Sequence, residues 1–148
     1  MPKEFLMRGK TASSGQEVLE FGHQARPGYG YRMKEFALWP SDNLGTTAVE
    51  LFAAVTSDNS AEDPINPNFN NDGLIAVAKF LFSGNNPVAE SIINDLFVIT
   101  QDLILSCRDT GGSATPVNWQ CRFEEIKLSA AAESVANYNQ FSIYNTSQ

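Results

Sequence analysis

Apolar and polar residues alternate along two segments of the chain, Leu96 to Cys107 and Val117 to Leu128, with a turn-rich stretch between them (108–116). A period of two is typical of half-buried β-strands, so this pattern predicts a long antiparallel β-hairpin. An even-sum register would place the apolar rows of both strands on one side of the sheet, facing the core. These rows are Phe97, Ile99, Leu103, Leu105 and Cys107 on the first strand and Val117, Trp119, Cys121 and Phe123 on the second.

The opposite face of this hairpin is expected to be wet or to meet a polar neighbour, since it carries mainly polar residues. They include Thr100, Asp102, Ser106, Asn118, Gln120, Arg122 and Glu124. Trp119 lies in the middle of the apolar row, so we expect it in the core.

Six further segments have the composition of strands and are separated by residues that favour turns. They are Glu4 to Arg8, Glu17 to Phe21, Gly30 to Trp39, Thr46 to Thr56, Leu74 to Phe82 and Tyr138 to Tyr144. The segment from Leu74 also fits helical spacing, but its phenylalanines and flanking glycines favour a strand. An alanine-rich run after Ser129 predicts a short helix at 130–136.

Eight strands in 148 residues predict an all-β fold, a single jelly-roll-like β-sandwich of about eight antiparallel strands with at most one short helix. Hydrophobic residues make up 43% of the chain, which suits one self-sufficient core and excludes a disordered chain. No repeat or linker is evident. We therefore expect one domain over residues 1–148, with a short basic N-terminal segment at about 1–15.

The chain carries a formal net charge of −7, and an acidic protein of this kind is not expected to bind nucleic acid. Residues 1–34 contain six bases and three acids, so the basic side chains gather early and the body is acidic. This is either ordinary scatter or a leading segment that pairs with an acidic surface of another copy. No apolar run is long enough to span a membrane and the start is too polar for a signal peptide, so we expect a soluble protein without a membrane partner.

Few residues suggest chemistry. Cys107 and Cys121 have neither redox nor zinc-site spacing, and we expect both to be free, because a bridge would require an overlong turn. His23 is the only histidine, and a nucleophilic triad would depend on it alone; we expect it in a solvent-facing loop. Adjacent Glu124 and Glu125 point to opposite faces of a strand and cannot act as a close acid–base pair.

Two stretches leave alternatives open. The oxygen-rich segment Ser57 to Gly73 is either a surface loop fixed by Asx turns or a calcium site, although an EF-hand alignment places Lys79 where the bidentate glutamate belongs. Aromatic and basic residues interleave from Tyr29 through Arg32 and Phe36 to Trp39, which suits an interface strand or ligand stacking. Strict alternation would place Tyr31, Met33 and Glu35 on one face of that strand and Arg32, Lys34 and Phe36 on the other. We assign no catalytic, cofactor-binding or metal-binding residue and expect no enzyme activity and no cofactor.

Several phrases of the sequence resemble small proteins encoded in marine bacteriophage genomes. They are Phe-Leu-Met-Arg-Gly-Lys-Thr (5–11), Pro-Gly-Tyr-Gly-Tyr-Arg-Met (27–33), Val-Ile-Thr-Gln-Asp-Leu-Ile-Leu (98–105), Val-Asn-Trp-Gln-Cys-Arg-Phe-Glu (117–124) and Ala-Asn-Tyr-Asn-Gln (136–140). The resemblance implies a non-enzymatic virion structural protein, such as a capsid, cement (decoration) or vertex component. Such a protein would be made in the host cytoplasm and reside in the virion, bound to copies of itself and to other virion proteins. The alternative is a carbohydrate-binding β-sandwich module, and a small hydrolase is a third hypothesis.

Overall fold

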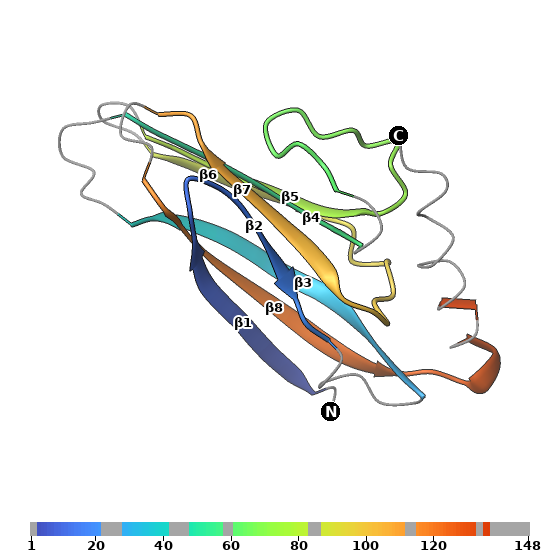
Figure 1. Ribbon diagram of the computed structural model, residues 1–148. Helices are drawn as coiled ribbons and strands as arrows, with labels where there is room; N and C mark the ends of the chain where they lie inside the picture. The colour runs from blue at the N-terminus through green and yellow to red at the C-terminus, as the bar shows by residue number, and fades with distance from the viewer. Residues whose placement is uncertain are drawn as a thin grey trace.

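A computed structural model describes residues 3–21, 28–41, 48–57, 61–82, 87–111, 115–132 and 135–136 of the chain. They form eight strands in two sheets packed face to face (Figure 1). The strands are β1 (Glu4–Thr11), β2 (Ser14–Leu19), β3 (Tyr29–Pro40), β4 (Val49–Ser57), β5 (Leu74–Phe82), β6 (Val88–Ile93), β7 (Leu103–Asp109) and β8 (Val117–Lys127). The predicted all-β sandwich is confirmed.

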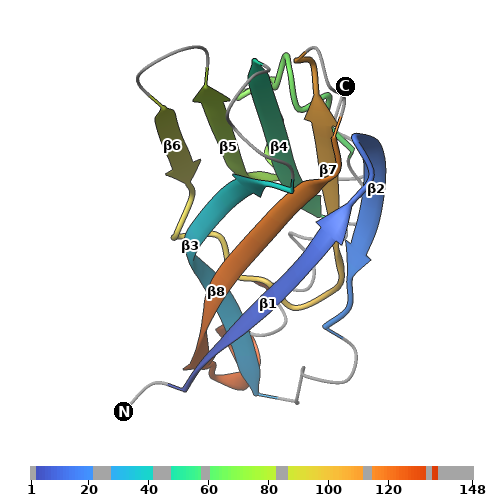
Figure 2. The ribbon, with the colours of Figure 1, turned by 90° about the vertical axis from the view of Figure 1, so that its left-hand side faces the viewer.

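The smaller sheet has the order β1-β8-β3 and the larger sheet β2-β7-β4-β5-β6, with every neighbouring pair antiparallel (Figure 2). The pairs β1–β8, β2–β7 and β4–β5 are those of a long hairpin rolled up on itself, as in a jelly roll. The remaining pair of that scheme, β3–β6, is not formed; β3 instead makes an isolated bridge from Tyr31 to Ile99, in the segment between β6 and β7, with hydrogen bonds of 2.9 and 2.7 Å. Strand β6 instead pairs with β5.

The core fills the space between the sheets. At one end it contains a cluster of four rings, Phe5, Phe21, Tyr31 and Phe123, with centroids 5.0 to 6.2 Å apart in the pairs that touch. Three of these side chains, all but Phe5, are almost completely buried. Rings at these separations add edge-to-face and stacking contacts to the burial of apolar surface, so they fix how the two sheets meet.

The predicted hairpin between the two alternating segments is wrong. β7 pairs with β2 and β4 in the larger sheet, whereas β8 pairs with β1 and β3 in the smaller one. The apolar rows are nevertheless buried, because they face each other across the core instead of lying side by side. The first segment is also shorter than predicted, since its strand begins only at Leu103 and Leu96 is 75% exposed. Trp119, with 6% exposure, is in the core as predicted.

Strand β3 departs from the predicted strict alternation because it contains a β-bulge between Met33 and Glu35. The extra residue, Lys34, shifts the phase, so the large buried side chains occupy odd positions before the bulge (Tyr31, Met33) and even positions after it (Phe36, Leu38). Met33 and Phe36 therefore both point into the core, although strict alternation placed them on opposite faces.

Other boundaries differ in detail. Strand β6 was not predicted, and β2 begins three residues earlier than expected. The short helix is found at 130–132 and 135–136, where the Ser129 hydroxyl accepts a hydrogen bond from the Ala132 backbone N–H (3.1 Å). The predicted strand Tyr138 to Tyr144 and His23 lie outside the described residues.

Candidate interaction surfaces

The two cysteines are buried and free, as predicted. The pKa of Cys107 is raised to about 12, mainly by burial and also by the nearby Glu17 carboxylate, while a hydrogen bond with Thr11 acts in the opposite direction. Burial, together with Cys107, also raises the pKa of Cys121 far above its usual value. Both thiols are therefore protonated at neutral pH and behave as small hydrophobic side chains rather than as nucleophiles.

The oxygen-rich loop before β5 uses its side chains to hold its own shape. Three Asx turns fix it, in which the side chains of Asp63, Asn68 and Asn71 accept hydrogen bonds from backbone N–H groups two residues later (2.8 to 3.0 Å). The Glu62 carboxylate accepts two more hydrogen bonds, from the Asn68 N–H (3.1 Å) and the Asn71 side-chain amide (2.8 Å). Among the described residues, no three His, Cys, Asp or Glu side chains cluster closely enough to hold a metal ion.

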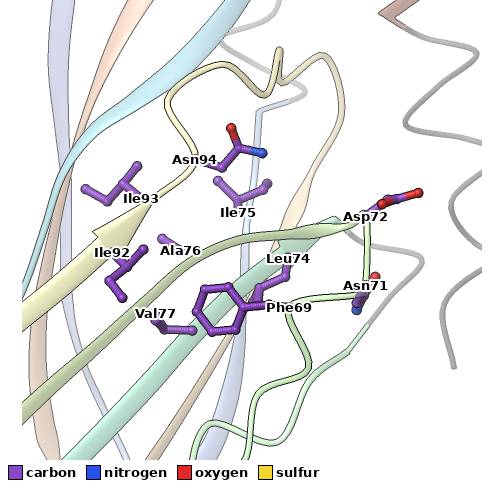
Figure 3. A pocket seen from close by; sticks show the side chains of 10 residues that line it. All are labelled: Phe69, Asn71, Asp72, Leu74, Ile75, Ala76, Val77, Ile92, Ile93 and Asn94. Atoms are coloured by element: carbon purple, nitrogen blue, oxygen red, sulfur yellow. The ribbon is translucent and has the colours of Figure 1, made fainter.

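This loop lies over the outer face of the larger sheet and leaves two hollows beside β5 and β6. One has a volume of about 310 Å³ and is lined by Phe69, Val77, Ile92 and Asn94, among others (Figure 3). The second, of about 240 Å³, lies between the loop prolines and the same two strands, and Val77 and Ile92 line it as well. Phe69 and Ile92 are 62% and 60% exposed; both line the first hollow, and Ile92 lines the second as well.

The outer face of the smaller sheet is polar and carries the second candidate surface. Trp39, Asn118 and Lys10 lie in one row across its three strands. The Trp39 ring is 61% exposed and rests against Phe80, with ring centroids 5.3 Å apart. In the next row Ala37, Gln120 and Arg8 are neighbours. Basic residues of the leading segment thus belong to a strand of the sheet.

Two acidic residues of this face, Glu4 and Glu35, form ion pairs. Arg122 of the central strand pairs with Glu4 (3.5 Å) and with Glu35 on the strands to either side. Glu124 lies opposite Glu4 and Arg32 on this face. Glu125 has the parity of the inward-facing row, and its carboxylate accepts a hydrogen bond from the Tyr31 hydroxyl (3.3 Å). The structure therefore gives Glu125 a structural partner.

Sequence reasoning identified Trp39 but missed Phe69, Val88 and Ile92. Val88 and Ile92 belong to the unpredicted strand β6, whose first five residues are all exposed, and such a strand has no buried row to reveal it. Among the described residues, no helix has both the length and the apolar character that a membrane span requires. Neither the known protein-family models nor the curated proteins include a match to this chain.

Proposed function

We propose that the protein is a non-enzymatic structural component that assembles with further copies of itself. The observation that carries this proposal is the pair of exposed apolar side chains Phe69 and Ile92 at the hollows beside β5 and β6, with the exposed Val88 farther along β6. Large contiguous apolar patches on soluble proteins commonly mark interaction sites. The resemblance to marine phage proteins supports the virion as the place where this assembly occurs.

The roles of the polar side chains support a non-enzymatic function. The buried Asp109 carboxylate accepts hydrogen bonds from the backbone N–H groups of Gly111 and Thr115, both at 2.8 Å, and so shapes the turn after β7. Asp102 accepts a hydrogen bond from the Phe21 N–H at 2.7 Å. These carboxylates, like the protonated thiols, stabilise the fold and are not poised for proton transfer or nucleophilic attack.

Size-exclusion chromatography with light scattering tests self-assembly, and we expect a stable oligomer. An apolar contact should hold or strengthen as salt is raised, whereas docking of the basic leading residues on an acidic surface should weaken. A monomer at every concentration and salt level would contradict the proposal. Detection of the protein, with a defined copy number, by mass spectrometry of purified particles tests its place in a virion.

Carbohydrate binding is the second candidate, favoured by the exposed Trp39 on a polar sheet face. An indole can stack on a sugar ring while Asn118 in the same row and Gln120 in the next row hydrogen-bond its hydroxyls. Glycan-array binding that is lost in Trp39→Ala would establish this function. Absence of binding on a broad array would remove it.

A further inference from the structure

We propose that β6 is the contact strand of the assembly, and that it pairs antiparallel with β6 of a second copy about a two-fold axis. This inference rests on the proposed self-assembly and adds the place and geometry of the contact. It follows from a comparison of the four strands that lie at sheet edges, β1, β3, β2 and β6.

Three of these edges carry features that discourage pairing with another chain. β1 presents exposed charges at Glu4, Arg8 and Lys10. β3 is distorted by its bulge at Lys34 and ends in Pro40, which lacks an N–H. β2 places the charged Glu17 on its inner face, opposite Leu105 of the neighbouring strand.

Strand β6 has none of these protections. It contains no proline, and its pairing with β5 is regular along its whole length. Its one charge, Glu90, forms an ion pair with Lys79 of the same copy at 3.6 Å. Lys34 and Asp95 near its end form another pair at 3.9 Å. The edge is thus apolar and locally neutral.

One hydrogen bond shows which residues of β6 direct their backbone N–H and C=O groups away from β5. The Asn94 N–H donates to the Ile75 carbonyl at 2.7 Å, and these residues continue the register in which Ile92 lies opposite Val77. Because hydrogen-bonded pairs alternate in an antiparallel ladder, Ile92 directs its backbone groups toward β5. Ala89, Ser91 and Ile93 direct theirs to the free edge, where no hydrogen bond from the described part of the chain reaches them. Another β-strand, paired along this edge, would supply hydrogen-bond partners for this row of backbone N–H and C=O groups.

The paired charges around β6 allow a second copy as the occupant, and the order of residues along the strand suits pairing with itself. Each copy carries −7, so two copies repel except where the local charge cancels, as it does around β6. A two-fold contact brings the same patch of each copy together. A register centred on Glu90 would oppose two carboxylates, which is unfavourable.

A register centred on Ile92 avoids this conflict. Ser91 then hydrogen-bonds with Ile93 of the second copy, and Glu90 faces Asn94 of the second copy. The two Ile92 side chains meet as a non-hydrogen-bonded pair, continuing the Val77–Ile92 row into the second copy. Phe69, which lies beside Val77 and Ile92 in Figure 3, flanks this row in each copy. The result is a continuous ten-stranded sheet.

The first test substitutes lysine at two matched positions. Ile92→Lys places a charge at the proposed two-fold axis, and Val18→Lys places the same charge on β2, at the opposite edge of the same sheet. Ile92 and Val18 are 60% and 57% exposed, so both variants should fold, which circular dichroism and thermal melting verify. We expect Ile92→Lys to be monomeric and Val18→Lys to assemble as the wild type does.

The second test uses cross-linking. Ile92→Cys should form a disulfide-linked dimer under oxidising conditions, because non-hydrogen-bonded pairs have Cα atoms about 4.5 Å apart, within the range of a disulfide. The two natural thiols are buried and should not interfere. Val18→Cys is the matched control and should remain largely unlinked. Ser91→Pro removes an N–H directed to the free edge while leaving the β5 ladder intact, so it should also weaken assembly.

The outcomes separate the two proposals. A wild-type oligomer that persists in Ile92→Lys and Ser91→Pro, with no Ile92→Cys dimer, overturns the β6 contact and leaves self-assembly standing. A wild-type protein that is monomeric throughout overturns both. Equal loss of assembly in Val18→Lys and Ile92→Lys would also overturn the β6 contact, because it would reflect charge alone.

Discussion

Strands β8 and β6 both carry apolar residues, but most of those in β8 are buried and most of those in β6 are exposed. β8 lies between β1 and β3, and its apolar row from Val117 to Phe123 faces the larger sheet with at most 6% exposure. β6 has one neighbour, and its apolar residues Val88 and Ile92 remain 42% and 60% exposed. The difference lies in position within the sheets rather than in side-chain type. We expect changes in β8 to alter folding and changes in β6 to alter association.

Trp119→Ala should have the largest effect on folding. The indole is buried, and its Nε1–H donates a hydrogen bond to the Thr11 hydroxyl at 3.0 Å. Removing a large buried aromatic side chain typically costs about 3–5 kcal/mol of unfolding free energy. Urea denaturation measures this cost, and Trp39→Ala, at a 61% exposed tryptophan, is the control with a smaller expected loss. Equal losses in the two variants would contradict the inward direction of the β8 row.

Gly9→Ala should have the next largest effect. Gly9 lies opposite Trp119, and a Cβ atom there would be 2.7 Å from the indole Cζ2, closer than atoms pack. Overpacking of this kind costs about 1–3 kcal/mol. The double variant Gly9→Ala/Trp119→Ala should lose less stability than the sum of the single variants, because the clash is then gone. Strict additivity would show that the two sites do not interact.

The free energy of unfolding should fall at alkaline pH because the two thiols are buried. The unfolded chain ionises its cysteines near pH 9, whereas the pKa of folded Cys107 is about 12. Between these values the unfolded state binds fewer protons, so stability present below pH 9 is lost as pH rises, by about 1.4 kcal/mol per pH unit for each thiol. Urea unfolding of wild type and Cys107→Ala from pH 8 to 10.5 should show a shallower decline in the variant. Parallel slopes would contradict a buried, protonated Cys107.

Strands β8 and β6 also show which features of the fold the sequence can predict and which it cannot. Alternation is local, so the apolar rows, the all-β class and the buried Trp119 were predictable. Pairing was not, because two rows facing one core produce the same pattern whether their strands are neighbours or lie in opposite sheets. The bulge at Lys34 is visible in the sequence as a change of phase, from apolar residues at 31 and 33 to apolar residues at 36 and 38, but strict alternation treated it as two faces of mixed polarity. β6 escaped prediction because Ala89, Glu90 and Ser91 lack strong strand preference and no face of the strand is buried.

The candidate contact was missed for the same reason, because Ile92 can be recognised as a contact residue only once β6 is known to be an edge strand.

Ile92→Thr is the substitution with the smallest expected effect on folding, and it tests whether β6 contributes to stability as β8 does. Threonine keeps the β-branched shape, and substitutions at exposed sites usually change stability by less than about 0.5 kcal/mol. Urea unfolding should be measured in dilute protein, because association stabilises the folded state as concentration rises. Under these conditions wild type and Ile92→Thr should unfold at nearly the same urea concentration, while concentrated wild type gains stability that the variant lacks. A loss of several kcal/mol in dilute solution would mean that β6 contributes to folding as β8 does, and the division between a folding strand and an association strand would be wrong.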